Sequence, residues 1–192
     1  MRKIEYDNYF WQNSLVRLRA WSAEDWEWDY YNSFDTSAVK LADFRVQLPK
    51  TVHESKNYSE KIANLSNNNG RIYFAVDTLE GTHVGRINLT NIDEINGTFQ
   101  IGILIDRDYR GKGYGTAAMK ILLEYAFMER RLNKYCGSIV EGNIGSSKMH
   151  KKLGCHQEGI CRQNIYMSGH YVDEILFGLT KENYLNNLDL TR

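Results

Sequence analysis

The chain has 192 residues, of which 42% are hydrophobic, 12% aromatic and 25% charged, and these values are ordinary for a globular protein with a sizeable core. Its 24 Lys and Arg residues balance its 24 Asp and Glu residues, which argues against nucleic acid as a partner. A run of about 18 apolar residues is absent from the sequence, which argues against a membrane span.

The cysteines Cys136, Cys155 and Cys161 match no zinc-binding spacing. We therefore expect reduced thiols, no metal and a cytoplasmic location. Cys136 and Cys155 stand among apolar residues and are expected in the core.

The first part of the chain predicts an edge strand followed by two helices. Residues 15–19 alternate apolar and basic side chains, which is typical of an edge strand. A helix is expected over about 22–32, and a second one begins at Thr51. Each begins at a capping residue, Ser22 or Thr51, with an acidic residue three positions later. The Asn-rich run 67–70, which closes on a glycine, predicts the end of the second helix.

The middle of the chain changes to a pattern of strands. We expect them over 71–77, 83–90 and 98–105, with turns at 79–81 and 96–97. The last of these strands is a near-continuous apolar run, so we expect a central strand that is buried on both faces.

The second half of the chain alternates helices with strands. A helix is expected over 113–130, because its apolar side chains recur at helical spacing. The remaining elements are a strand, a short helix and two strands that flank a Ser-Gly turn, at 134–140, 144–153, 157–167 and 171–179. This alternation predicts one α/β domain over residues 1–192.

The segment between the predicted central strand and the helix after it is rich in glycine. Gly111, Gly113 and Gly115 lack the Cβ atoms that would keep a ligand away from the backbone. The first turn of a helix has N–H groups without internal partners, and with the helix dipole these favour an anion. Arg110 and Lys112 add positive charge. A pyrophosphate suits this place, although the spacing matches neither the Rossmann nor the Walker pattern.

The pattern R-x-x-G-x-G, at Arg110, Gly113 and Gly115, resembles the pyrophosphate loop of the GNAT acetyltransferases. Residues 143–155 resemble the second signature of that family. The segment 166–179 resembles the C-terminal hairpin of its Rim-type and spermidine N-acetyltransferase members.

The resemblance implies an α/β (α+β) GNAT fold, in which a mixed, mostly antiparallel sheet with a splayed strand pair is flanked by helices. It implies acetyl-CoA as co-substrate, direct attack of a primary amine on the thioester, and possible assembly as a homodimer. The acceptor stays open between a small amine, such as a polyamine or amino sugar, and a protein N-terminus. The alternative function is a non-catalytic CoA-binding sensor or scaffold.

Two residues receive catalytic roles from the resemblance. The backbone N–H of Ile105 is the candidate donor to the oxyanion, and His150 stands where many members have a tyrosine that protonates the thiolate. His150 has a second interpretation, as a surface histidine on a basic helix. The residues expected to hold acetyl-CoA are Ile103, Leu104, Ile105, Arg110, Gly111, Lys112, Gly113, Tyr114, Gly115, Thr116, Asn143 and Ser146.

The general base and the acceptor site are less defined. Gln100 stands where several relatives have a glutamate, so the base is sought at Glu141, Asp173 or Glu174, or in a chain of waters. The acceptor is expected between the first helices and the C-terminal hairpin. The aromatic and acidic residues of 21–31 suit a cationic amine, and they equally suit a core face beside a solvated acidic face. The hairpin residues Tyr166, His170 and Tyr171 have the same two interpretations.

Overall fold

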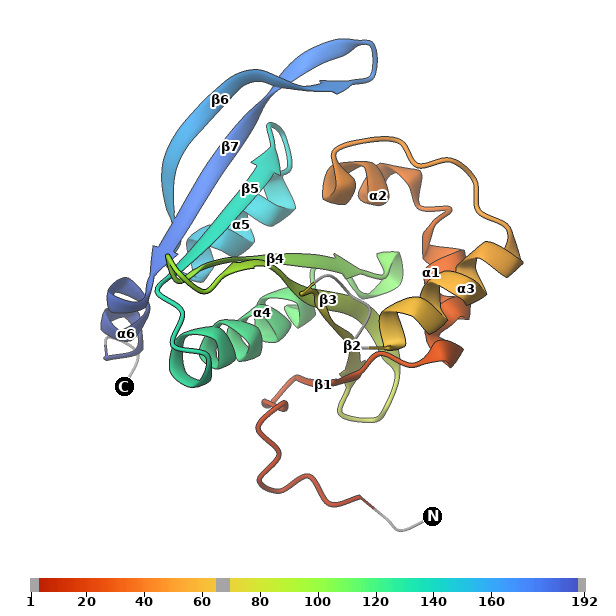
Figure 1. The fold of residues 1–192 in the computed structure, drawn as a ribbon, viewed down its shortest axis with the longest axis horizontal. Helices are drawn as coiled ribbons and strands as arrows, with labels where there is room; N and C mark the ends of the chain where they lie inside the picture. The colour runs from red at the N-terminus through yellow and green to blue at the C-terminus, as the bar shows by residue number, and fades with distance from the viewer. Residues whose placement is uncertain (1–3, 65–69, 190–192) are drawn as a thin grey trace.

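The computed structural model describes residues 4–64 and 70–189, and a seven-stranded sheet forms its centre (Figure 1). The strands lie in the order β1-β2-β3-β4-β5-β7-β6. Neighbouring strands are antiparallel except β4 and β5, which are parallel. The strand bounds are β1 Val16–Ala20, β2 Ile72–Thr78, β3 His83–Asp93, β4 Thr98–Ile105, β5 Lys134–Val140, β6 His156–Met167 and β7 His170–Thr180.

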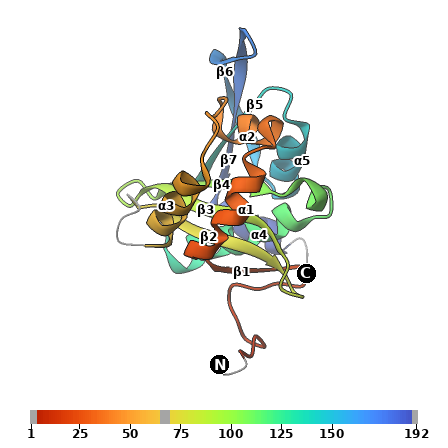
Figure 2. The ribbon, with the colours of Figure 1, turned by 90° about the vertical axis from the view of Figure 1, so that its right-hand side faces the viewer.

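Helices cover both faces of this sheet (Figures 1 and 2). Strand β2 shows this directly, because successive side chains of a strand point to opposite faces. Tyr73 and Ala75 pack with Trp21 and Ile62 on one face, while Phe74 joins the larger core on the other. The helix bounds are α1 Trp26–Asn32, α2 Thr36–Asp43, α3 Val52–Ala63, α4 Tyr114–Glu124, α5 Ile144–Lys152 and α6 Lys181–Asp189.

The larger core lies between the sheet and helix α4. Ala118 and Leu122 of α4 are fully buried there together with Phe99 of β4, and Tyr135 of β5 is 2% exposed. Burial of a large apolar side chain contributes about 1.5–3 kcal/mol. This core therefore fixes the position of α4, and with it the glycine-rich loop that precedes α4.

The predicted elements are confirmed in type, with three differences. Helix α3 begins as expected, with reciprocal bonds between Thr51 and Glu54, but it ends at Ala63. Most of the predicted stop signal lies outside the described residues. The helix expected over 113–130 is α4 followed by one π-helical turn, Tyr125–Glu129. Helices α2 and α6 were not predicted.

Strands β4 and β5 pair at only one end. Their register covers Thr98 with Lys134 and Phe99 with Tyr135, and beyond these pairs the strands diverge. The expected splayed strand pair is thus confirmed. The expected burial of β4 on both faces is wrong for its second half, because Ile101, Ile103 and Ile105 are only partly buried beside the gap.

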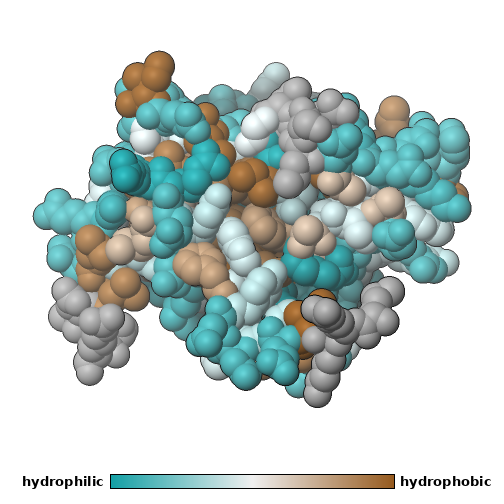
Figure 3. Space-filling model, turned by 60° about the horizontal axis from the view of Figure 1, so that its bottom comes forward, coloured by the Kyte–Doolittle hydropathy of each residue, from teal (hydrophilic) through white to brown (hydrophobic). Residues whose placement is uncertain are grey.

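Strands β6 and β7 form a long hairpin that rises above the body of the molecule in Figure 1. Its turn has positive φ at both central residues, 55° at Ser168 and 86° at Gly169, as a tight hairpin turn requires. The lower side of the molecule in Figure 1, away from the tip of this hairpin, is mostly hydrophilic around a smaller apolar area (Figure 3).

Candidate functional site

A cleft of about 630 Å³ opens where β4 and β5 diverge. Its lining comes from the second half of β4, the glycine-rich loop, the start of α4, β5, α5 and α2. The site is therefore built from segments that the sheet topology brings together, and its floor is the main core.

The glycine-rich loop lies at one end of this cleft. Gly111 and Gly113 have φ of 77° and 90°, a left-handed conformation that favours glycine. Gly113 is the N-cap of α4, and no side chain caps that helix. The first N–H groups of α4 therefore lack intrahelical partners at the cleft. A Cβ added at Gly111 would meet no heavy atom within 4 Å, so the space over the loop is open. The loop is suited to bind a phosphate group.

Strand β4 turns unpaired backbone groups toward the gap. The N–H of Asp106 donates to the Val84 carbonyl oxygen of β3 at 2.9 Å. Because hydrogen-bonded and non-bonded pairs alternate along an antiparallel ladder, the N–H groups of Ile103 and Ile105 point away from β3. They face β5, which has already diverged.

Asp35, at the start of α2, ties that helix to the loop. Its carboxylate lies 3.0 Å from an Arg107 nitrogen and 2.7 Å from an Arg110 nitrogen. Arg110 also donates from Nε to the Ile105 carbonyl oxygen at 2.8 Å. The pKa of Asp35 is lowered to about 2, mainly by its hydrogen bond with Arg107. Arg110 and the N–H of Ala38 add to this effect, and together the three outweigh burial, which alone would raise the pKa.

This lowered pKa predicts a stability difference that depends on pH. Asp35 stays ionised to a lower pH in the folded protein than in the unfolded chain. Its ion pairs with Arg107 and Arg110 therefore stabilise the folded state fully at any pH above the pKa of Asp35 in the unfolded chain. The contribution, about 2 kcal/mol at most, is lost as pH falls through about 2. We expect Asp35→Asn to lower the free energy of unfolding by urea at pH 7, and the gap from the wild type to shrink below about pH 4.

Arg107→Gln serves as the control, because it removes the largest contribution to the shift and should produce part of the same gap. A gap of constant size between pH 7 and pH 2.5 would contradict this assignment.

His150 of α5 is 3% exposed at the inner wall of the cleft, and the interpretation as a surface histidine is wrong. Its Nδ1 lies 2.8 Å from the Ser146 carbonyl oxygen, which can only accept, so Nδ1 carries the hydrogen. Its Nε2 lies 3.0 Å from the Tyr135 hydroxyl. The ring packs nearly parallel to Phe177, at 4.8 Å between centroids. Burial lowers the pKa of His150, against the opposing effect of the Ser146 bond, so the imidazole is neutral at pH 7.

Tyr135 completes this arrangement from β5. In the neutral imidazole Nε2 is an acceptor, so the Tyr135 O–H donates to it. Gly137, two residues along the strand, leaves the space for this contact. A Cβ at Gly137 would lie 2.6 Å from the Tyr135 oxygen and 2.7 Å from Nε2. Burial raises the pKa of Tyr135 and keeps it protonated.

The structure brings together all the predicted site residues except Lys112. Asn143 caps α5 by accepting from the Ser146 N–H at 3.1 Å, and both residues line the cleft. Lys112 is exposed, with its amine 5.0 Å from the centre of the Tyr109 ring, and it does not line the cleft. Among the described residues the cleft lining includes no Asp or Glu.

The three carboxylates considered as bases lie elsewhere. Glu141 is exposed, Asp173 accepts from the Gln163 N–H at 2.8 Å, and Glu174 accepts from the Asn164 amide at 2.7 Å. None of the three belongs to the lining of the cleft. The structure therefore offers no support for any of them as a general base.

A model of the GNAT acetyltransferase domain matches residues 16–156 of this chain. The chain belongs to the GNAT acetyltransferase family.

Relatives of this acetyltransferase include YokL of Bacillus subtilis (strain 168), named an uncharacterized N-acetyltransferase derived from the SPbeta prophage. It is 29% identical over 91% of this chain and 95% of its own length. Spermidine N(1)-acetyltransferase of Escherichia coli (strain K12) is 26% identical over 55% of this chain and 57% of its own length. These relatives are named N-acetyltransferases, and the chain is an acyltransferase.

Solved structures show the same fold. Spermidine N-acetyltransferase from Vibrio cholerae, in complex with CoA and spermine, aligns with a TM-score of 0.79 over 91% of this acetyltransferase and 100% of that chain, at 20% identity. A probable acetyltransferase aligns with a TM-score of 0.75 over 88% of this chain and 95% of its own, at 26% identity.

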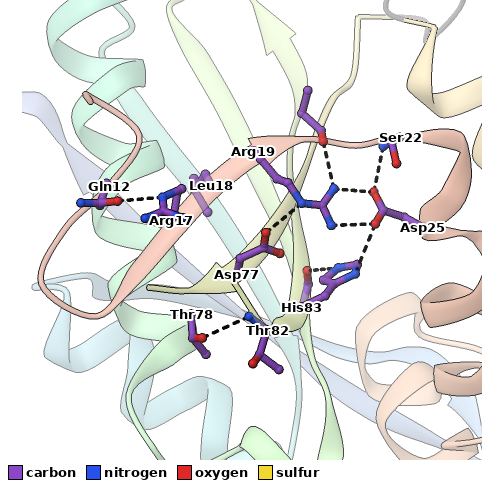
Figure 4. Close-up of polar contacts among 12 residues, drawn as sticks. Gln12, Arg17, Leu18, Arg19, Ser22, Asp25, Asp77, Thr78, Thr82 and His83 are labelled. Carbon is purple, nitrogen blue, oxygen red and sulfur yellow. Dashed lines mark hydrogen bonds and ion pairs between the residues drawn. The ribbon is translucent and has the colours of Figure 1, made fainter. Parts of the chain in front are cut away.

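Four of the acidic and aromatic residues expected at the acceptor site of this acetyltransferase, namely Trp21, Asp25, Trp28 and Asp29, instead hold the fold together. Asp25 accepts two bonds from Arg19, which also pairs with Asp77, and His83 lies 3.3 Å from Asp25 (Figure 4). This network joins the first three strands to the start of α1. Asp29 is likewise buried, in ion pairs with Arg86 and Lys50, and Trp21 and Trp28 pack in the smaller core.

Two parts of the cleft were missed by sequence reasoning. Helix α2 contributes Ser37, Ala38 and Leu41 to the wall, and Asp35 before it is a favourable N-cap residue and is the local signal for this helix. Tyr135 is one apolar position among several on its strand, and no local signal separates it from ordinary core residues.

The remaining expectations concern thiols, metals and membranes. Cys155 is buried, and burial raises the pKa of its thiol to about 12, whereas Cys136 is only partly buried, contrary to expectation. Within residues 4–64 and 70–189, no group of three His, Cys, Asp or Glu side chains is arranged for a metal. In that same part of the chain, no helix combines the length and apolar character of a membrane span.

Proposed function

We propose that this protein transfers the acetyl group of acetyl-CoA to a primary amine, by direct attack of the amine on the thioester. The observation that carries the proposal is the continuous cleft from the glycine-rich loop to the gap between β4 and β5. The residues present fit the coenzyme, because the loop has left-handed glycines and an uncapped helix start where phosphate would lie.

Each part of the cleft has a distinct role in this proposal. The first N–H groups of α4 hold the pyrophosphate, and the pantetheine arm runs along the unpaired edge of β4. The Ile105 N–H donates to the oxygen that becomes negative during attack, because it faces the gap without a strand partner. Asn143 and Ser146 contact the pantetheine arm from α5.

Proton movement is assigned to His150. Its lowered pKa makes it a proton acceptor at neutral pH, so it takes the proton of the attacking amine before it serves as an acid. The same imidazole then returns that proton to the CoA thiolate. A separate carboxylate base is not needed in this scheme, in keeping with the lining described above.

The acceptor side of the cleft is mostly apolar. Helix α2 contributes Ala38 and Leu41, and Phe44 follows that helix. A polycation such as spermidine is best bound by carboxylates, and none is among the described residues of the lining. The lining favours an amine next to an apolar group, and of the acceptor classes considered a peptide N-terminus fits best.

The experiment measures acetyl transfer from acetyl-CoA to each of four acceptors: spermidine, glucosamine, kanamycin and an alanine tetrapeptide. The reaction is monitored by the free CoA thiol that it releases. We expect turnover, with kcat/KM for the tetrapeptide above that for spermidine. No turnover with any of the four, while CoA still binds tightly, would favour the sensor alternative. The relatives, which are named acetyltransferases, already favour the enzyme. The single domain over 1–192, the cytoplasmic location and the homodimer stay predictions.

A further inference from the structure

The imidazole of His150 has no free nitrogen with which to reach a substrate. Nδ1 is held by the Ser146 carbonyl group and Nε2 by the Tyr135 hydroxyl, while Phe177 covers the ring. A proton therefore reaches Nε2 through its hydrogen-bond partner, the Tyr135 hydroxyl.

We propose that the Tyr135 hydroxyl is the relay through which His150 exchanges protons with the reacting atoms in the cleft. This inference rests on the acetyl transfer proposed above. Tyr135 and His150 both line the cleft, from two elements that pack side by side, and their polar atoms lie 3.0 Å apart. That distance is within the range for proton transfer along a hydrogen bond.

The hydroxyl changes its role with the charge of the imidazole. When His150 is neutral, the Tyr135 O–H donates to Nε2. When His150 is protonated, both ring nitrogens donate, and the Tyr135 oxygen becomes the acceptor. The hydroxyl hydrogen is then free to point into the cleft, where a thiolate would need it.

The reaction balances along this path. The amine nitrogen bonds to the thioester carbonyl carbon, and the π electrons of the carbonyl group move to its oxygen. A proton passes from the new ammonium group to the Tyr135 oxygen while the hydroxyl hydrogen of Tyr135 passes to Nε2 of His150. The C–S bond then breaks with its electron pair on sulfur, and the proton returns through Tyr135 to that sulfur. The products are the amide and the CoA thiol, and both side chains regain their first state.

The surroundings favour this path over others. The described lining of the cleft has no carboxylate that would compete for the proton. Gly137 leaves room for the contact, since a Cβ there would lie within 2.7 Å of both polar atoms. A small residue at this position of β5 therefore has a reason beyond packing.

Tyr135→Phe tests the relay, because it keeps the ring in the core and removes only the hydroxyl. We expect kcat with acetyl-CoA and the best amine of the panel to fall by about 10- to 50-fold. The KM for acetyl-CoA should stay within about twofold, because no phosphate contact changes. Tyr184→Phe is the matched control, since Tyr184 is buried in the same core but does not line the cleft. It should leave both constants unchanged.

The pH profile distinguishes the relay from a structural role. Because His150 must begin neutral, kcat should fall as pH drops through its lowered pKa. The Tyr135 hydroxyl stabilises the charged imidazole more than the neutral one, because a hydrogen bond from a charged donor is the stronger of the two. Tyr135→Phe should therefore lower the pKa of His150 further and move the acidic limb of the kcat profile to lower pH. The other titratable groups near the pair are the thiols of Cys136 and Cys155, and burial raises the pKa of both. Lys148 and Lys152 of α5 also line the cleft.

A second variant and a second readout keep the test sharp. Gly137→Ala should also lower kcat, because it separates the two groups while keeping both. Titration of the His150 imidazole by NMR, which needs no acceptor amine, should show the same shift in Tyr135→Phe. This readout distinguishes failure of the relay from failure of the proposed transfer. Any of three results would overturn the relay. They are an acidic limb that does not move in Tyr135→Phe, a wild-type kcat in Tyr135→Phe or Gly137→Ala, and a loss of kcat in Tyr184→Phe as large as in Tyr135→Phe.

Discussion

Replacement of Gly113 by valine is expected to weaken the binding of CoA by about 100-fold or more. The valine side chain would stand at the N-cap of α4, where the first N–H groups of the helix are open to the cleft. Loss of one or two hydrogen bonds to a charged phosphate, at about 1.5–3 kcal/mol each, accounts for a change of this size. Isothermal titration with CoA measures it directly.

Backbone strain is the main complication in this test, because Gly113 has a φ of 90° and a β-branched residue there costs about 1–3 kcal/mol. Gly81 provides a matched control. It lies in the turn between β2 and β3 with a φ of 91°, and a Cβ there would meet no heavy atom within 4 Å. Gly81→Val should carry similar backbone strain and keep normal CoA affinity, whereas a Cβ at Gly113 would in addition lie 3.3 Å from Leu15 Cδ2. Normal affinity in Gly113→Val would count against the assignment of the loop.

Replacement of His150 by phenylalanine is expected to lower kcat by about 100- to 1,000-fold, the usual range for loss of a positioned acid–base group. A phenyl ring can keep the contact with Phe177, so the fold and the affinity for CoA should change little. The residual activity should lack the acidic limb of the wild-type profile, because the group that must be neutral is gone. Steady-state kinetics from pH 5 to pH 9 would show both effects.

His156→Phe is the control for the second prediction, since His156 is exposed at the start of β6 and lies outside the cleft. It should preserve both kcat and the acidic limb. An unchanged kcat in His150→Phe would reject the role of this residue, and the relay through Tyr135 would fall with it. An unchanged kcat in Tyr135→Phe alone would remove the relay and keep His150.

The agreement between prediction and structure follows the range of the interactions concerned. The strand–loop–helix arrangement around the glycines could be predicted because all its parts are contiguous: the apolar strand, Gly111, Gly113 and the start of α4. Arg110 lines the cleft, but its partner Asp35 is 75 positions earlier in the chain, and only folding shows that the charge of Arg110 is shared.

The acidic residues near the N-terminus show the opposite case. Asp25 and Asp29 appear in the sequence as charges available to a cationic acceptor. The sheet brings Arg19 and Arg86 beside them, and both carboxylates are buried in ion pairs. Burial of a carboxylate is favourable only with such partners, so the choice between solvent and core depends on residues far away in the chain.

The sequence by itself determined the order of most strands and helices and the place of the glycine-rich loop, because hydrophobic spacing and glycine positions act over a few residues. The tertiary structure alone decided that His150 and Tyr135 meet. His150 and Tyr135 stand on a helix and a strand that meet only when α5 packs on the sheet. Their burial lowers the pKa of one side chain and raises that of the other, and burial is a property of the whole fold.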